Sequence, residues 1–437
     1  MFLYQVRIAW KSLLRNPVLS ILLVAGIAMG IAVASVFVTA YYIFSGNPIP
    51  HKSDRLYYVE LDSWNPQRAW DEDNPQRAPN QLTYIDTRGI EGSDIPTHQT
   101  AMFQANMTVQ PKGEDLKPYR EDVRMCRGDF FRMFDVPFLY GGPWGASADD
   151  APDPVVVIDA ETNRKLFGGE NSVGRPLTLD NRNYTIVGVL DDWRPNVKFY
   201  DPTQGASGDP EKIFMPFNHV EPLRLTTSGN TNGWKFTAGN QLEDFWASED
   251  TWLQYWVQLD SRAQKEEYKA FLDAYATEQK KLGRFQRPLN NKVLSVMEWL
   301  EDQEVVPESS RTMLIIALLF LLVSSVNLIG ILLGKFLSRA PEIGVRRALG
   351  ASRRSVFIQH IVECELVGVL GGILGLGLSV IALKVINRMF ENQTPFVLDF
   401  NMVAAALFLS LVAGLVAGVY PAWRICRVAP ARYLKLQ

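Results

Sequence analysis

The chain has 437 residues, of which 47% are hydrophobic and 21% are charged, and its formal net charge is −3 at pH 7. This average covers two unlike parts, because residues 45–310 hold 28 Lys and Arg against 42 Asp and Glu, whereas the rest of the chain holds 16 against 5. An insert of net charge −14 excludes a nucleic-acid-binding domain, which must neutralise phosphates, and four scattered histidines without a close pair give no reason to expect a zinc site.

Residues 1–16 predict an amphipathic helix at the start of the chain. Val6 and Leu13 fall on one helical face, whereas Arg7 and Lys11 fall elsewhere. A basic helix of this kind is typical of a segment that lies on a membrane surface.

Four stretches without charge predict four transmembrane helices. The first lies between Arg15 and Lys52 (36 residues), the second follows Arg311 (23 residues), the fourth follows Asp399 (24 residues), and the third contains 18 uncharged residues from 366 to 383. Each is close to the ~17–25 residues that a helix needs to span a bilayer. A cleaved signal peptide is an alternative for the first stretch, although its apolar run is about twice the usual ~7–15 residues. We assign the spans to residues 17–44, 311–336, 355–387 and 401–422.

Basic residues mark one side of these spans. Three Lys or Arg precede the first span, six lie between Lys335 and Arg354, and four follow the fourth span. All three segments fall on the same side of a four-span topology, which the positive-inside rule assigns to the cytoplasm. The cytoplasmic parts are expected to be both termini, the loop 337–354 and the tail 423–437, with residues 45–310 and the short loop 388–400 outside.

Glycines recur four residues apart in three of the predicted spans, a spacing that lets helix backbones approach closely. We therefore expect a packed bundle. Asn327 is a polar side chain inside the second span, and we expect it to bond across a dimer formed by the first and second spans. The glycines expected at helix contacts are Gly26, Gly30, Gly371, Gly372, Gly414 and Gly418.

The insert between the first two spans predicts a large α+β extracytoplasmic domain, so the expected fold class is a membrane protein with four transmembrane helices and this domain inserted between the first and second. Trp252 and Trp256 are four residues apart and are expected to share a helix face. The insert contains no motif of a catalytic site, so we do not expect an enzyme. The expected strands are 55–61 and 154–159, with a hairpin over 177–190 and helices over 160–167 and 262–282.

The loop between the second and third spans predicts a short capped helix parallel to the membrane. Pro341 suits the first helical position, and Glu342 favours the positive end of the helix dipole. Gly350 can end the helix in a left-handed conformation, and Ser352 can cap the next helix. The side chains expected to make contacts are Ile343, Arg346, Arg347, Ala348 and Leu349.

This loop closely resembles that of MacB/FtsX-type ABC transporter permeases, in which a run like R-E-I-G-[IV]-R-[RK]-A-L-G-A precedes the third span. Pro341 replaces the usual Arg, and the match then continues through Ala351. Tyr420–Arg424 is similar to the closing motif of the family, and residues 166–177 with 186–190 resemble its periplasmic core domain. Residues 191–290 match nothing in this pattern, so the specificity for a substrate or partner stays open there.

The resemblance implies a dimeric permease, made of two identical or two paralogous chains, in the inner membrane of a bacterium. It also implies a separate ABC ATPase subunit, which binds ATP and Mg and receives the loop helix as a coupling helix. The chain itself is expected to hold no cofactor, because Gly330–Lys335 lacks the spacing of a P-loop. The coupling residues implied are Glu342, Ile343, Gly344, Arg346, Arg347, Ala348, Leu349 and Gly350.

The expected function is export of a substrate, driven by ATP hydrolysis in the partner and transmitted to the outer domain; a periplasmic adaptor is a further possible partner. The alternatives are a mechanotransmitter that regulates a periplasmic hydrolase or sensor, a lipoprotein-extraction subunit, and a membrane-anchored enzyme. Residues 294–306 are expected to be helical and to lead past Pro307 into the second span. Glu363 is expected to point into the bundle or toward the cytoplasmic loop, where Arg353 or Arg354 could pair with it, whereas Glu365 points to another face of the helix.

Overall fold

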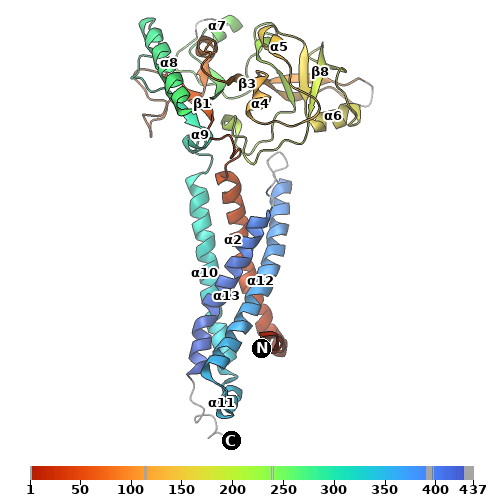
Figure 1. Cartoon of the computed structure of the whole chain (residues 1–437), viewed down its shortest axis with the longest axis vertical. Helices are drawn as coiled ribbons and strands as arrows, with labels where there is room; N and C mark the ends of the chain where they lie inside the picture. Colours follow the sequence, from red (N-terminus) through yellow and green to blue (C-terminus); the bar gives the residue numbers. More distant parts are fainter. Residues whose placement is uncertain are drawn as a thin grey trace. The chain divides into compact units, whose positions relative to one another are not determined.

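The computed structural model describes residues 2–112, 116–237, 239, 241–389, 396 and 398–427. The chain divides into two compact units, one formed by Met1–Ser45 with Val306–Gln437 and the other by Gly46–Val305. The first unit is helical and the second contains the sheet (Figure 1). A large α+β domain is thus inserted between the first and second of four candidate membrane helices, as the sequence predicts.

Four helices in the described part of the chain are long and apolar enough to cross a membrane. Each includes the whole stretch predicted for it from the sequence. Parts of two predicted loops, residues 390–395 and 397 within 388–400 and residues 428–437 within 423–437, lie outside the described residues. The four helices are α2 (Pro17–Ser45), α10 (Glu308–Leu337), α12 (Arg353–Met389) and α13 (Phe400–Cys426).

Glycines allow α2 to pack closely on two neighbours. A Cβ atom at Gly30 would lie 2.8 Å from a methyl group of Leu321 on α10, and one at Gly26 would lie 3.1 Å from Leu328. On the α12 side, a Cβ atom at Gly371 would lie 2.7 Å from Ile27. Gly26 and Gly30 therefore let α2 and α10 of one chain approach closely.

Three further glycines lie at the contact between α12 and α13. A Cβ atom at Gly372 would lie 2.5 Å from Ser410 Oγ, and one at Gly418 would lie 2.5 Å from Cys364 Cβ. A Cβ atom at Gly414 would lie 3.2 Å from the carbonyl oxygen of Cys364. A larger residue at these positions would force the helices apart, because tightly packed interiors tolerate added volume poorly.

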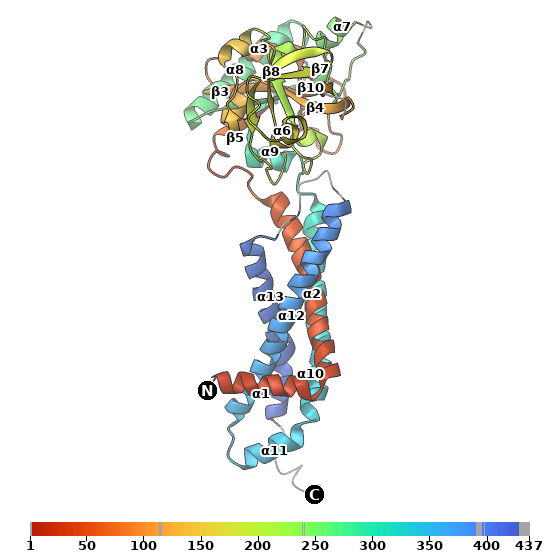
Figure 2. The same ribbon diagram turned by 90° about the vertical axis from the view of Figure 1, so that its right-hand side faces the viewer.

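Two shorter helices lie at one end of this bundle. Figure 2 shows α1 (Phe2–Arg15) running across the long helices, with α11 (Ala340–Ala348) beyond their ends. Ala9 and Leu13 of α1 are buried, and Trp10 is exposed. The amphipathic helix predicted for residues 1–16 is present, and its apolar side packs partly on the bundle.

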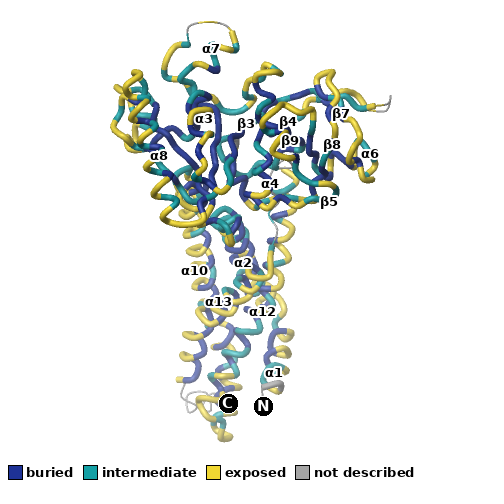
Figure 3. Tube along the Cα trace, turned by 45° about the horizontal axis from the view of Figure 1, so that its top comes forward, coloured by how far each residue is buried: buried dark blue, intermediate teal, exposed yellow. Residues whose placement is uncertain are grey.

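The outer domain contains an eleven-stranded mixed sheet with the order β11-β1-β10-β3-β4-β9-β6-β8-β5, while β2 pairs with β10 and β7 pairs with β3 and β8. The pairs β4/β9 and β6/β8 are parallel, and the other pairs are antiparallel. Most strand residues are buried, as Figure 3 shows. The strands are β1 (Leu56–Glu60), β2 (Leu82–Thr83), β3 (His98–Gln110), β4 (Tyr119–Cys126), β5 (Phe138–Gly141), β6 (Val155–Ile158), β7 (Pro176–Leu179), β8 (Arg182–Leu190), β9 (Ile213–Pro216), β10 (Thr251–Gln258) and β11 (Lys292–Ser295).

Helices of five to twenty residues accompany this sheet. α6 begins where Asp159 accepts a hydrogen bond from the backbone N–H of Thr162, and ends at Gly168, whose φ is +71°. Both ends follow directly from the sequence, since Asp is a good N-cap and Gly accepts the left-handed conformation. The helices are α3 (Tyr84–Ile90), α4 (Asp129–Met133), α5 (Ala146–Asp150), α6 (Ala160–Phe167), α7 (Leu242–Trp246), α8 (Arg262–Lys281) and α9 (Val296–Asp302).

Two predictions for the outer domain are wrong. Trp252 and Trp256 lie on strand β10, not on a helix, and both are fully buried. A spacing of four places two side chains on the same face of a helix and of a strand, so the spacing could not distinguish them. Residues 294–306 do not run as one helix into the second span: α9 starts after a capping box at Ser295 and ends at Asp302, and α10 starts after Pro307.

Candidate coupling site

The loop helix α11 is built as its sequence predicts. Pro341 and Glu342 lie in its first turn, and Arg346 lies in its last turn. Gly350 follows with a φ of +104°, a conformation that L-amino acids rarely adopt. Ser352 then accepts a hydrogen bond from the backbone N–H of Ser355 and so caps α12.

The side chains of α11 divide into an anchored set and an exposed set. Ile343 is only 8% exposed and belongs to the hydrophobic core of the bundle, so the expectation that it contacts a partner is wrong. Leu349 is 83% exposed and Val345 is 49% exposed. Gly344 is buried and Ala348 is exposed. The free apolar surface of this helix thus consists of Leu349, which the sequence analysis names, and Val345, which it does not.

The basic residues of α11 are already engaged within the chain. Arg347 donates a hydrogen bond to the carbonyl oxygen of Cys426 at the end of α13, at 3.1 Å. Arg346 pairs with Glu342 at 3.1 Å, and Glu342 also lies 3.4 Å from Arg15 of α1. The last two are exposed pairs, which contribute about 0–1 kcal/mol each. They leave Arg346 and Glu342 able to exchange partners.

A buried ion cluster lies next to α11, where α1, α10 and α12 meet. Glu363 of α12 is 2% exposed, and its carboxylate lies 2.7 Å from Lys335 Nζ at the end of α10. Arg339 Nη1 lies 3.8 Å from the same oxygen, and the hydroxyl of Ser12 on α1 donates a hydrogen bond to it. Arg339 also donates to the carbonyl oxygen of Ser12 at 3.0 Å. Glu363 thus points into the bundle, one of the two orientations expected for it, but its partners are not Arg353 or Arg354.

This cluster joins four segments at a single carboxylate. Lys335 belongs to α10, Arg339 precedes α11, Ser12 belongs to α1 and Glu363 belongs to α12. Removing one partner of a buried ion pair costs about 3–5 kcal/mol, because the other charge is left without compensation. The cluster thus ties the residue that precedes α11 to the end of α10, to α1 and to α12. Sequence reasoning missed Lys335, although a charge in the last turn of a predicted span is a recognised signal.

The two glutamates of α12 are not equivalent. Glu363 is enclosed by its partners, whereas Glu365 is partly exposed and its Oε1 has no hydrogen-bond partner among the described residues. Their spacing of two places them on different faces of the helix. A cavity of about 230 Å³ opens beside Glu363, and its lining comes from α1, α11 and α12, including Lys11, Arg339, Arg346 and His360.

The outer domain holds a second buried ion network. Arg124 of β4 is fully buried and lies 2.7 Å from Asp201, and it also pairs with Glu211. Lys198 Nζ lies 2.6 Å from Glu211, and the hydroxyl of Tyr200 donates to the same carboxylate at 3.0 Å. Burial by itself would raise the pKa of Glu211, but the charges of Arg124 and Lys198 hold it well below its usual range.

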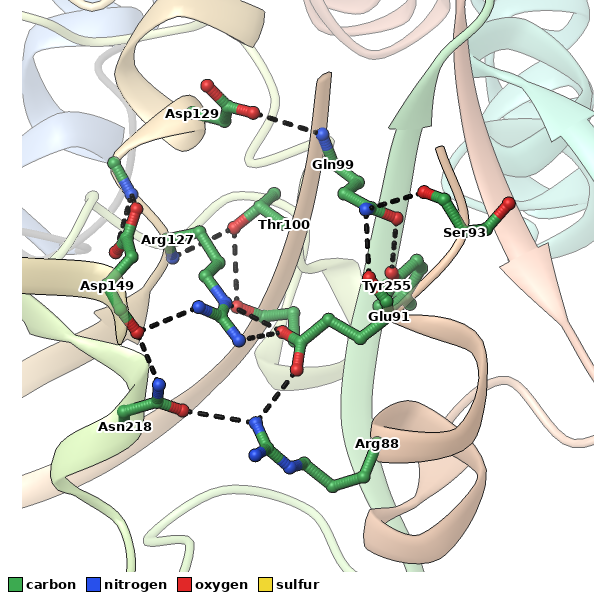
Figure 4. A network of polar contacts seen from close by, with 12 residues as sticks. Arg88, Glu91, Ser93, Gln99, Thr100, Arg127, Asp129, Asp149, Asn218 and Tyr255 are labelled. Carbon is green, nitrogen blue, oxygen red and sulfur yellow. Dashed lines mark hydrogen bonds and ion pairs between the residues drawn. The ribbon is translucent and has the colours of Figure 1, made fainter. Parts of the chain in front are cut away.

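A third polar network, shown in Figure 4, lines an open cleft of about 540 Å³ in the outer domain. Arg127 donates to Glu91 at 2.6 Å and to the carbonyl oxygen of Asp149 at 2.9 Å. Arg88 bonds to the other oxygen of Glu91 at 2.9 Å and to Asn218 at 3.1 Å. These groups satisfy one another's hydrogen bonds, so the network fixes the loop that follows α3 against α5. In the described residues, no three His, Cys, Asp or Glu side chains are grouped to hold a metal ion.

Comparisons with known proteins match both units. Residues 20–275 match the MacB-like periplasmic core domain family, and residues 314–430 match the FtsX-like permease C-terminal family. The macrolide export ATP-binding/permease protein MacB of Salmonella paratyphi A is 22% identical over 424 residues, which are 97% of this chain and 59% of that protein. The probable syringafactin export ATP-binding/permease protein SyfD of Pseudomonas syringae pv. tomato is 24% identical over 361 residues, which are 81% of this chain and 46% of that protein.

The chain therefore spans about 59% or less of the length of these relatives. Among solved structures, the periplasmic region of MacB from Actinobacillus actinomycetemcomitans aligns with 58% of this chain and 94% of its own, with a TM-score of 0.36 and 12% identity. The match to the MacB-like periplasmic core domain by itself covers more than half of the residues. The chain belongs to the MacB/FtsX-type family of ABC transporter permeases.

Proposed function

We propose that this chain is the permease subunit of a MacB-type ABC transporter, which transmits ATP hydrolysis by a separate ATPase subunit to its outer domain and so drives export of a substrate. The observation that carries this proposal is the construction of α11. One side of this helix is fixed in the bundle through Ile343 and the adjacent Arg339, while Val345 and Leu349 are exposed. A helix fixed on one side and free on the other suits the transmission of a movement.

The exposed residues suit an apolar groove on the ATPase. Burying two aliphatic side chains stabilises a complex by up to about 3–6 kcal/mol. Arg346 lies beside them and can exchange its exposed pair with Glu342 for an acidic group of the partner. ATP and Mg would be bound by that partner.

A second permease chain is the other partner proposed, and its contact would lie on α10. This span buries the smallest share of its surface among the four, and Asn327 is exposed on it beside Val323 and Val326. A hydrogen bond between Asn327 side chains would satisfy a polar group in the bilayer at about 0.6–2 kcal/mol. Cysteines at Val323 or Val326 should cross-link between chains, whereas failure of both to cross-link would contradict this contact.

The proposed location is the inner membrane of a bacterium, with both termini in the cytoplasm and the large domain in the periplasm. The distribution of basic residues supports this orientation. An export role would also accommodate a periplasmic adaptor protein.

The coupling proposal is tested by the double variant Val345→Asp/Leu349→Asp. Two charges on the exposed side of α11 should abolish co-purification of the ATPase while leaving membrane insertion intact, because neither residue packs in the bundle. Leu282→Asp is a matched control, since Leu282 is 74% exposed and lies in the outer domain. Undiminished co-purification of the double variant would contradict the proposed docking surface.

A further inference from the structure

An open cavity in the outer domain is lined by three tryptophans from two loops. It has a volume of about 620 Å³ and is formed by residues 64–70 and 231–234. Trp64, Trp70 and Trp234 are only partly buried, whereas Trp252, Trp256 and Trp299 are enclosed in the domain core. Apolar side chains that gather on a surface and are rimmed by polar residues can mark a ligand-binding groove.

The loops that carry these tryptophans are held in place. Asn232 exchanges two backbone hydrogen bonds with Thr251 of β10, at 2.8 and 3.0 Å, and its side-chain amide donates to Gln81. On the other loop, Trp64 and Trp70 pack edge to face with ring centroids 4.7 Å apart. The cavity is thus part of the folded domain and exists before any ligand arrives.

The polar groups at the cavity limit the chemistry of its ligand. The side-chain amide of Asn232 donates one hydrogen bond, to Gln81, whereas the indole nitrogen of Trp234 is buried and is not available to a ligand. Arg68, the charged residue of the lining, is paired with Glu72 at 2.7 Å. The lining therefore offers flat apolar faces, amide groups and no uncompensated charge.

We propose that this cavity binds a neutral saccharide. The apolar C–H faces of a pyranose ring would pack on the tryptophan rings, and its hydroxyl groups would bond to the side-chain amides of Asn65 and Asn232. A wholly apolar ligand would leave these amide groups without partners, and an anionic ligand would have to displace Glu72 from Arg68 before it gained a counter-ion. Free oligosaccharides and polymeric glycans share this chemistry, and the inference does not depend on coupling to an ATPase.

The test uses the full chain in detergent, titrated with maltotriose and with tri-N-acetylchitotriose while tryptophan fluorescence is recorded. We expect a saturable change below about 10 mM for at least one of them. Trp234→Ala should weaken binding about tenfold, and Trp234→Phe, which keeps an aromatic face, should weaken it about threefold or less. Phe236→Ala is the matched control, because Phe236 is 90% exposed two residues away and does not line the cavity.

A measurement on the unmodified protein keeps the inference testable if the variants fail to fold. Saturation-transfer NMR should show transfer from aromatic protons of the protein to the ring C–H protons of the bound sugar. Sedimentation with insoluble peptidoglycan distinguishes the sources: binding to it supports a polymeric glycan, and binding to the soluble sugars alone supports a free oligosaccharide. Absence of saturable binding to every saccharide, or binding of neutral indole alone, would overturn the inference.

Discussion

The membrane bundle and the outer domain are each stabilised by a different kind of internal contact. In the bundle, small residues such as Gly30 and Gly372 let helices touch, and the buried ion pair between Lys335 and Glu363 lies at the end where α11 attaches. In the outer domain, the interior is filled by large aromatic side chains and crossed by the network of Arg124. The comparison teaches that the bundle places its buried charges beside α11, whereas the outer domain places them inside its core.

The largest loss of stability is expected from a substitution in the outer domain. Arg124→Ala would leave two buried carboxylates, those of Asp201 and Glu211, short of a partner. The free energy of unfolding should fall by about 3–5 kcal/mol, measured by chemical unfolding followed through tryptophan fluorescence. Arg224→Ala removes an exposed pair with Glu243 and should cost about 0–1 kcal/mol. Equal losses of unfolding free energy in the two variants would show that the buried network stabilises the domain no more than an exposed pair does.

A slightly smaller loss of stability is expected from a substitution in the ion cluster of the bundle. Lys335→Ala leaves Glu363 with Arg339 at 3.8 Å and Ser12, so the loss should approach about 3 kcal/mol. The double variant Lys335→Met/Glu363→Gln removes both charges and should restore most of that stability. Thermal unfolding of the purified protein in detergent measures both. If the double variant were no more stable than the single one, the loss would come from packing and not from the unpaired charge.

Steric substitutions test how closely the bundle is packed. Gly372→Ala places a methyl group against Ser410 and should destabilise the bundle by about 1–3 kcal/mol. Gly377→Ala is the matched control on the same helix, because nothing lies within 4 Å of a Cβ atom there. The melting temperatures of the two variants in detergent provide the measurement. A control as unstable as Gly372→Ala would show that the close contact between α12 and α13 is not limiting.

The smallest effect expected is a pH dependence from Glu60 of β1. Burial raises the pKa of Glu60 to about 8; the like charge of Asp302 adds to this, and Lys292, 3.3 Å away, opposes it. Because the pKa in the folded state lies above the ordinary value, the folded domain binds the proton more tightly than the unfolded chain does. The resulting stability is complete below about pH 4.5 and is lost as the pH rises through about 8.

The melting temperature of the outer domain should therefore fall between about pH 6 and pH 9, by a free-energy change of a few kcal/mol at most. Glu60→Gln should flatten that dependence and stabilise the domain at high pH. Glu301→Gln changes an exposed residue of α9 and should leave the slope as it is. Identical slopes in the unmodified protein and in Glu60→Gln would exclude this residue as the source.

The contrast between local and long-range contacts explains how much of the structure could be predicted from the sequence. Span lengths, the caps of α11 and the hairpin of β7 and β8 depend on neighbouring residues, so local patterns were sufficient. The sheet order could not be predicted, because β9 pairs with both β4 and β6, which are distant in sequence. The partner of Glu363 was mistaken for the same reason: Arg353 is ten residues away along the helix, whereas Lys335 arrives from another helix.

The most direct test of the coupling mechanism measures movement of the outer domain when the ATPase partner hydrolyses ATP. Fluorescent labels on cysteines at Leu282 in the outer domain and at Phe400 on α13, both highly exposed, report the distance between the two units. The account predicts a distance change that requires Mg and ATP and that disappears in Val345→Asp/Leu349→Asp. The same ATP-driven change in that variant, or none in the unmodified complex, would contradict transmission through α11.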